Sequence, residues 1–430
     1  MRELMQPPGT SRLFYGHYIV GGCFLILLFC WGMVLNTFPV FVAPVTQDMG
    51  WTRASLAVTQ LTGMVTSILL FPIAGKIVDR FGARHIMTVG ALILGLALLG
   101  GSQSTHIAHF YIMNGFVGVG LTCTTLVPCS FVISNWYVSR RGTAMAVAFV
   151  GTATGGMIMS PVAEWIIRNY DWRTALMVAG IEILVLVIPI TLFLIRTRPS
   201  DMGLEPYGGT AATTGDDQEV WGVNEKEAFR LPVFWLIASI IFLGALVTAG
   251  VGFNCVAYLE DVGHSPERAT LAWSLIMGAM ILGKLTTGPV ADRWGSKQTM
   301  VAVSILFAVS MVVLTFSQSY FAVMIFVAIY GFTLGAPLIL NPLLTGDYLG
   351  MKNYGSLFGI LNILGTLGGG LGSIGAASYQ DRHDTYLPVF YVFAILMLVS
   401  AVCSLLISPI PQRVAAIRAA NPADVSDTKD

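Results

Sequence analysis

Long runs of apolar residues, separated by short polar intervals, repeat along the whole chain of 430 residues. A helix needs roughly 20 residues to cross the hydrocarbon core of a bilayer, and twelve of these runs reach or approach that length. The predicted spans are 18–43, 55–77, 86–102, 108–134, 143–167, 174–195, 232–258, 268–291, 299–317, 320–345, 355–379 and 386–407. The pattern therefore predicts an all-α membrane protein with twelve transmembrane helices.

One long polar interval, residues 196–230, divides the spans into six and six. We therefore expect two bundles of six helices in a pseudo-symmetric arrangement. The predicted organisation is an N-terminal bundle at 1–195, a cytoplasmic linker at 196–230, a C-terminal bundle at 231–407 and a cytoplasmic tail at 408–430.

Composition supports lipid rather than water as the solvent of this chain. Hydrophobic residues make up 55% of the sequence and charged residues only 11%, against roughly 25% charged residues in a soluble domain. The 23 basic and 23 acidic residues balance, which argues against a nucleic-acid partner. The six cysteines fall in apolar stretches, and His106 and His109 lack a third ligand, so we expect no metal and no cofactor.

The distribution of basic residues predicts the orientation. Loops facing the cytoplasm carry an excess of Lys and Arg. With both termini cytoplasmic, 17 basic residues lie inside and five lie outside, and the remaining one, Lys284, falls within a span. The outer five are Arg53, Arg168, Arg173, Arg268 and Arg382. We expect a multi-pass protein of the cell membrane, specifically of the bacterial inner membrane.

An internal repeat supports the division into two halves. The loop after the second span and the loop after the eighth share glycine, aspartate, arginine, glycine and a terminal base at the same spacing. The two sets are Gly75, Asp79, Arg80, Gly82 and Arg84, and Gly288, Asp292, Arg293, Gly295 and Lys297. Glycine permits a close helix approach, the acid suits the N-terminus of a neighbouring helix, and the bases suit acidic partners. We expect these motifs to support a cytoplasmic gate.

The duplicated loop resembles the signature of the major facilitator superfamily, whose two halves are parallel repeats around a central path. A narrower similarity is to its monocarboxylate transporter-like and oxalate/formate antiporter-like branch. The residues that carry it are 15–20 (YGHYIV), 39–41 (PVF), 49–53 (MGWTR), 140–144 (RRGTA), 198–206 (RPSDMGLEP), 234–235 (FW), 347–350 (DYLG) and 353–355 (NYG). The resemblance implies transport of a small substrate by alternating access.

Lys284 is the one base predicted at membrane depth. An ammonium there costs several kcal/mol, so it normally faces a water-filled cavity and has a partner or a function. Its own helix places no acid three or four residues away. An anionic substrate can supply the missing charge, and the resemblance agrees, because monocarboxylate transporters usually carry a carboxylate-binding arginine at this position. The alternative is a lysine that extends to the cytoplasmic interface.

Three departures from the family pattern bear on coupling. Some members place a proton-carrying acid where this chain has Met280, and certain members have a lysine where this chain has Asn36. Asn114 likewise stands where many superfamily members carry an arginine. A proton relay therefore does not transfer from the resemblance, and proton symport and anion exchange both stay open.

Five further polar residues lie within predicted spans, and each suits either the lining of a cavity or a hydrogen bond between helices. They are Asn36, Asn114, Asn254, Tyr330 and Asn362. We favour Tyr330 as a lining residue, because an aromatic ring with a polar tip suits an organic acid.

The sequence thus predicts a secondary active transporter, not an enzyme. The expected partners are a small organic anion, foremost a monocarboxylate, protons in the case of symport, and membrane lipid. We expect it to function as a monomer. Alternatives are an anion antiporter, a carrier of a larger aromatic or dicarboxylic acid, and a membrane sensor that binds the anion without moving it. No HExxH, carboxylate dyad or GxSxG pattern falls within a span.

Overall fold

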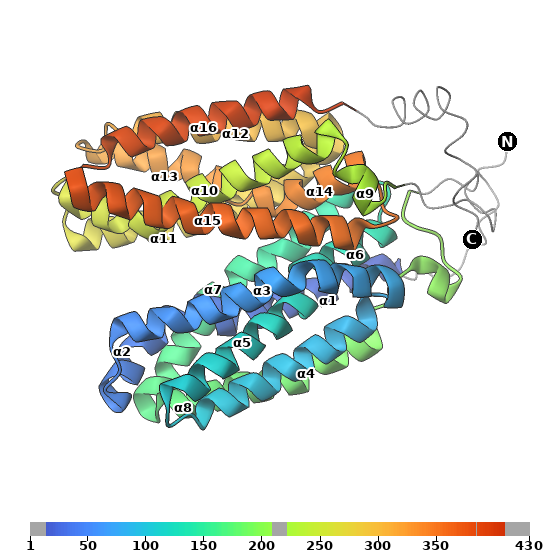
Figure 1. Ribbon diagram of the computed structural model, residues 1–430, viewed down its shortest axis with the longest axis horizontal. Helices are drawn as coiled ribbons and strands as arrows, with labels where there is room; N and C mark the ends of the chain where they lie inside the picture. Colours follow the sequence, from blue (N-terminus) through green and yellow to red (C-terminus); the bar gives the residue numbers. More distant parts are fainter. Residues whose placement is uncertain (1–13, 209–221, 384, 409–430) are drawn as a thin grey trace.

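The computed structural model describes residues 14–208, 222–383 and 385–408, and these are almost entirely helical (Figure 1). Within them, twelve helical segments are long and apolar enough to cross a membrane, and each overlaps one of the predicted spans. The predicted fold class is therefore confirmed. Residues 209–221 of the predicted linker and 409–430 of the predicted tail lie outside the described residues.

The first six spans contain α-helices and three short π-helical segments. They are α1 (Tyr15–Cys30), η1 (Trp31–Asn36), α2 (Phe38–Met49), α3 (Arg53–Phe81), α4 (Ala83–Ser102), α5 (Ile107–Thr124), α6 (Leu126–Trp136), α7 (Arg141–Asn169), α8 (Trp172–Glu182), η2 (Ile183–Val187) and η3 (Ile190–Leu194). We call this group the N-bundle. It occupies the lower half of Figure 1.

The second group of helices, the C-bundle, occupies the upper half of Figure 1. It contains α10 (Pro232–Asp261), α11 (Pro266–Trp294), α12 (Ser296–Leu314), α13 (Tyr320–Leu334), α14 (Pro337–Leu349), α15 (Tyr354–His383) and α16 (Leu387–Leu406). Two short helices, η4 (Pro199–Met202) and α9 (Glu225–Ala228), belong to the connection between the bundles.

Local sequence signals explain where several helices begin and end. The side chains of Thr52, Asp171 and Ser265 cap α3, α8 and α11 by accepting a hydrogen bond from a backbone N–H three residues on. Gly82 (φ +81°) and Gly295 (φ +89°) end α3 and α11 in a conformation that favours glycine. The two glycines occupy equivalent positions in the internal repeat, so the repeat shapes both turns alike.

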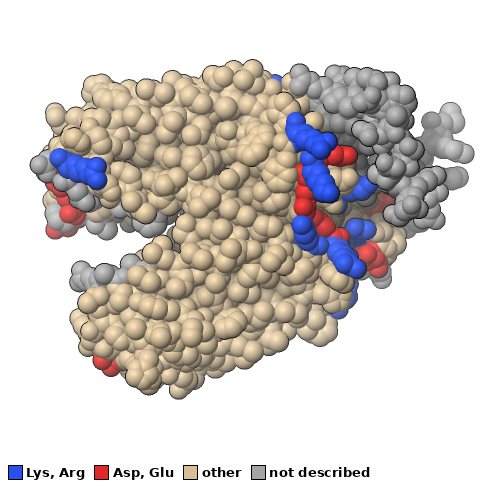
Figure 2. All heavy atoms as spheres, viewed as in Figure 1, with Lys and Arg blue, Asp and Glu red and all other residues tan. Residues whose placement is uncertain are grey.

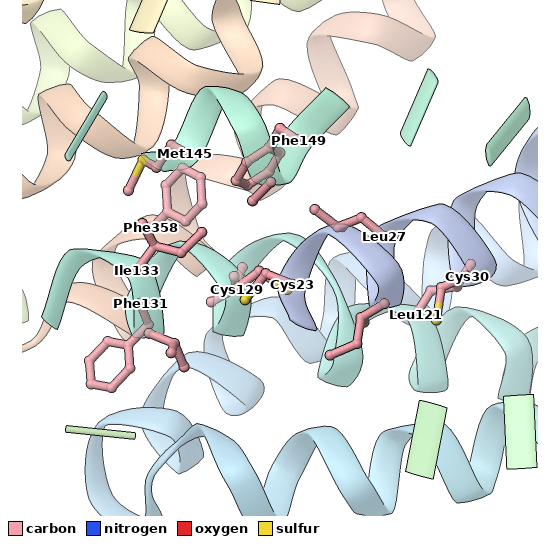
Figure 3. Close-up of a cluster of buried hydrophobic side chains, with 14 of the residues drawn as sticks. Cys23, Leu27, Cys30, Leu121, Cys129, Phe131, Ile133, Met145, Phe149 and Phe358 are labelled. Atoms are coloured by element: carbon pink, nitrogen blue, oxygen red, sulfur yellow. The ribbon is translucent and has the colours of Figure 1, made fainter. Parts of the chain in front are cut away.

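The most extensive contacts between the bundles are made by two pairs of helices. α3 packs along α15, and α7 packs along α11, each pair joining one helix from either half. One core of buried apolar side chains fills the N-bundle and continues into α14 and α15, and Figure 3 shows part of it, with Cys23, Cys30 and Cys129 among the buried side chains. A second core lies wholly within the C-bundle.

The two ends of the molecule differ. Lys, Arg, Asp and Glu side chains gather at the end seen on the right of Figure 2, which we call the charged end. The turns α3–α4 and α11–α12, which carry the duplicated motif, belong to it. At the opposite end the two bundles separate and leave an open cleft (Figure 2). The structure is thus closed at the charged end and open at the other.

Candidate functional site

The duplicated motif lies where the two bundles touch. At what we call the α7–α11 crossing, the carboxylate of Asp292 accepts hydrogen bonds from the backbone N–H groups of Gly142 and Thr143, both at 2.7 Å, and from the Thr143 hydroxyl at 2.5 Å. These donors belong to the first turn of α7, where a negative charge also interacts favourably with the helix dipole. Asp292 therefore joins the C-bundle to the N-bundle.

The same arrangement recurs at what we call the α3–α15 crossing. Asp79 accepts hydrogen bonds from the backbone N–H groups of Gly355 and Ser356, both at 2.9 Å, in the first turn of α15. The donors of the two crossings are also related by the internal repeat. The offset from Gly142 to Gly355 equals the offset from Asp79 to Asp292, so both the acceptor and the donors of the contact are repeated.

Glycine makes both crossings possible. A β-carbon on Gly288 would collide with the backbone of Gly142, and one on Gly142 would lie 2.6 Å from the carbonyl oxygen of Gly288. A β-carbon on Gly75 would likewise collide with Gly355, and one on Gly355 would lie 2.7 Å from the Gly75 carbonyl oxygen. The four glycines let the helix backbones touch.

The motif arginines differ from expectation. Arg80 and Arg293 are exposed and form no ion pair with any residue that the structure describes; Arg80 lies instead over the ring of Phe81, 5.2 Å from its centroid. The prediction that these bases meet acidic partners is therefore wrong for this conformation. Arg84 is half-buried and anchors the next helix, its backbone N–H 3.4 Å from the Thr197 hydroxyl.

Ion pairs form beside the crossings through residues to which the sequence analysis gave no role. Arg141 pairs with Asp347, which also accepts a hydrogen bond of 2.5 Å from the Ser296 hydroxyl. Arg141 belongs to the run that carries the family resemblance, so its position directly before a motif-contacting glycine was the signal available in the sequence.

The short helix α9 adds a second ion pair at the other crossing. Lys76 of α3 lies 3.0 Å from the carboxylate of Glu225, and that carboxylate also accepts a hydrogen bond from the Ser356 hydroxyl of α15. Partial burial opposes ionisation of Glu225, but the bonds from Ser356 and Lys76 outweigh it and hold its pKa below the usual range. The connecting segment thus holds both bundles at one point, which we call the α9 clamp.

Lys284 lies one helical turn above the α7–α11 crossing and has no exposed surface. Its ammonium donates a 2.7 Å hydrogen bond to the hydroxyl of Thr152 and a 3.4 Å bond to the carbonyl of Phe149, both in α7. No carboxylate among the described residues lies within ion-pair distance of it. The side chain faces the opposite bundle instead of extending to the charged end, so the snorkelling alternative does not apply in this conformation.

Asn36 also contacts Thr152 of α7. Its amide donates a 2.9 Å hydrogen bond to the backbone carbonyl of Thr152. Asn36 is exposed although it lies within the first span, and it ends the π-helical segment η1. Such segments are frequent at functional sites. Lys284, Thr152 and Asn36 therefore form one polar cluster, which we call the Lys284 cluster.

The other asparagines do not join this cluster. Asn254 is buried and bonds to carbonyl groups of Gly250 and Ser373, which makes it a link between α10 and α15. Asn362 is half-buried and donates to the Phe358 carbonyl of its own helix. Asn114 donates to the Phe110 carbonyl and lines a pocket in the N-bundle.

Tyr330 does not line a cavity in this structure. Its side chain is fully buried, stacked on Phe307 and Phe326 at centroid distances of 5.4 and 4.9 Å, and its hydroxyl donates to the carbonyl of Thr248 at 3.3 Å. The expectation from the sequence is corrected, because the C-bundle itself supplies both the apolar contacts and the hydrogen-bond acceptor.

The pocket beside Asn114 has a volume of about 190 Å³ and lies between η1, α3 and α5. We call it the N-bundle pocket. Its walls include Trp31, Phe38, Met64, Phe71, Val117 and Thr122. Leu35, directly before Asn36 in the chain, also lines it, so the pocket and the Lys284 cluster share the η1 segment.

Comparisons with known proteins identify the family of the chain. Residues 22–283 and 249–427 match the Major Facilitator Superfamily. The chain is 24% identical to human monocarboxylate transporter 12, over 90% of this chain and 79% of that protein. It is 25% identical to the MFS transporter asaE of Aspergillus flavus, over 69% of this chain and 64% of that protein.

Among solved structures, the fold is similar to that of the human organic anion transporter MFSD10 (TETRAN), with a TM-score of 0.70 and 15% identity. That similarity covers 93% of this chain and all of the other. Because the family match covers nearly the whole sequence, the chain belongs to the Major Facilitator Superfamily and is a multi-pass membrane transporter rather than an enzyme.

Proposed function

We propose that the protein carries a small organic anion, foremost a monocarboxylate, across the membrane by alternating access. The observation that carries the proposal is Lys284, an ammonium with no exposed surface, whose partners among the described residues are a hydroxyl and a carbonyl of the opposite bundle. A buried charge without a counter-charge is costly, and a bound carboxylate would supply it.

Binding of the anion requires one local change. In this conformation the Lys284 ammonium donates a hydrogen bond to the Thr152 hydroxyl. The substrate carboxylate replaces that hydroxyl as the acceptor, because a charged acceptor forms the stronger hydrogen bond. Lysine presents a point charge without the planar fork of arginine, so it holds the carboxylate through single hydrogen bonds. Because the Lys284–Thr152 bond joins the two bundles, its exchange for a substrate bond couples binding to their relative movement.

Alternating access requires that the two ends of the molecule open in turn. We assign the charged end to the cytoplasm by the positive-inside rule, which places the start of α1 and the end of α16 on that side. The two crossings then form the cytoplasmic gate, closed here, and the cleft opens to the other side. Both halves of the path come from one chain, so a monomer suffices.

The names of similar proteins support an anionic cargo. Human monocarboxylate transporter 12 and the human organic anion transporter MFSD10 (TETRAN) are named for carboxylates and organic anions. Proton symport and anion exchange remain the two coupling modes to separate. Uptake driven by an imposed pH gradient indicates symport, and uptake that requires a preloaded anion indicates exchange.

The decisive experiment is uptake of radiolabelled carboxylates into proteoliposomes by Lys284→Gln, with Lys226→Gln as the matched control. Lys226 is an exposed residue of the short helix α9, outside both copies of the duplicated motif and outside the Lys284 cluster. We expect Lys284→Gln to reduce uptake by about a hundredfold, since a charged hydrogen bond contributes roughly 1.5–3 kcal/mol, and Lys226→Gln to retain it. Unchanged uptake of every carboxylate by Lys284→Gln would contradict the proposal.

A further inference from the structure

The N-bundle pocket has the features of a ligand site rather than of a packing defect. The hydroxyl of Thr122 is buried in it without a hydrogen-bond partner among the described residues. The amide of Asn114 donates to the Phe110 carbonyl, which leaves its oxygen available as an acceptor. Buried polar atoms normally have partners, so the unpartnered hydroxyl of Thr122 beside this hollow indicates that something polar enters it.

Three aromatic rings contribute to the walls of the pocket, beside aliphatic side chains such as Val117 and Leu121 and polar ones such as Gln60. Trp31, Phe38 and Phe71 line it, together with the flexible side chain of Met64. Aromatic rings prefer aromatic partners in offset or edge-to-face contact, and methionine also packs well against rings. A volume of about 190 Å³ suits one ring, because an apolar cavity of about 150 Å³ binds benzene.

The internal repeat places this pocket at the depth of Lys284. Phe71 and Lys284 occupy equivalent positions in the two repeats, each four residues before the glycine of its motif. Each therefore lies one helical turn, about 6 Å, from its own crossing. The two repeats are related by an axis along the membrane normal. The aromatic wall and the ammonium thus face the same level of the path from opposite bundles.

We propose that the N-bundle pocket binds the aromatic ring of the transported acid, so that the substrate is an aromatic carboxylate rather than a small aliphatic one. The proposal rests on the proposed function of Lys284, which binds the carboxylate end. The η1 segment connects the two subsites, because Leu35 lines the pocket and Asn36 bonds to Thr152. The ring adds affinity through the apolar surface that it buries.

The test measures binding of benzoate and propionate to the purified full-length protein by isothermal calorimetry. We expect benzoate to bind at least about tenfold more tightly than propionate. Val117→Phe fills the pocket from α5, and Met64→Phe fills it from α3. Either variant should bring benzoate down to the affinity of propionate and leave propionate unchanged, which also shows that the variant is folded.

A matched control places the same substitution outside the pocket. Val119→Phe lies two residues along α5, in an open groove with the exposed Phe116, and should leave both affinities unchanged. Equal affinities in the wild type, or a benzoate preference that survives both filling variants, would overturn the pocket proposal while leaving carboxylate transport intact. Unchanged binding of both acids by Lys284→Gln would instead overturn the proposed function.

Discussion

The two crossings between the bundles share a backbone plan and differ in side-chain chemistry. In each, two glycines bring helix backbones into contact and an aspartate accepts hydrogen bonds from the N-terminus of a helix in the other bundle. One turn above, however, the α7–α11 crossing carries Lys284, and the α3–α15 crossing carries Phe71 at the equivalent position.

The hydroxyl groups beside the aspartates differ as well. Thr143 donates to Asp292 within its crossing, whereas the equivalent Ser356 donates to Glu225 of the α9 clamp. The repeat therefore keeps the glycine and aspartate contacts that hold two helices together, while the residues beside them differ between the two crossings. Under the proposed function, this difference gives the substrate path an ammonium on one side and an aromatic ring on the other.

The largest effect is expected from the glycines, because a methyl group there must push two backbones apart. Gly288→Ala and Gly75→Ala should each reduce uptake in proteoliposomes by at least about tenfold, since overpacking costs about 1–3 kcal/mol. Gly278→Ala on α11 is the control, since its β-carbon meets nothing within 4 Å. It should be neutral or stabilising. If Gly75→Ala retained full uptake, the two crossings would not be mechanically equivalent.

An intermediate effect is expected from the aspartates. Asp292→Asn removes a charge that accepts three hydrogen bonds, and Asp79→Asn removes one that accepts two. The closed charged end should lose roughly 1–2 kcal/mol in the first case and less in the second. Double electron–electron resonance between spin labels on the two bundles measures the shift toward opening at this end. A larger shift for Asp79→Asn would reverse the ranking.

The smallest effect is expected from the ion pairs. The side chains of Lys76 and Glu225 are 59% and 30% exposed, against 14% and 38% for Arg141 and Asp347. Solvent screens the first pair more, so double-mutant cycles on thermal stability should give a larger coupling for Arg141–Asp347, with both below about 1 kcal/mol. Equal couplings would show that α9 holds its pair more firmly than its exposure suggests.

The pH dependence of the α9 clamp follows from Glu225. The pKa of its carboxyl lies below the usual range in the folded protein, so its contribution is fully present above the ordinary glutamate pKa, about 4.3. It is lost only as the pH falls through the lower folded value. The coupling between Lys76 and Glu225 should therefore be the same at pH 6 and pH 8 in the same double-mutant cycles.

Much of the fold was predictable because lipid imposes a simple rule. Apolar runs of sufficient length must form spanning helices, so twelve spans could be counted. The repeat of glycine and aspartate at one spacing predicted the location of both crossings. Close approach of two helices requires glycine, and the N-terminus of a helix favours an acidic side chain, so residue type alone indicates both contacts. Helix rotation was not predictable, because nearly all-apolar helices show no distinct face. The sequence therefore predicts Tyr330 in a cavity, whereas the structure buries it in the core of the C-bundle.

The sequence by itself determined the twelve helices, the two repeats and the isolation of Lys284 as the one base that lies away from the ends of a span. Only the tertiary structure decided what Lys284 meets, because Thr152 and Phe149 belong to the other bundle and lie 132 and 135 residues away. The α9 clamp and the N-bundle pocket likewise depend on contacts between distant segments. Local residue patterns specify helices and their ends, whereas the environment of a charge depends on which helix faces turn toward one another.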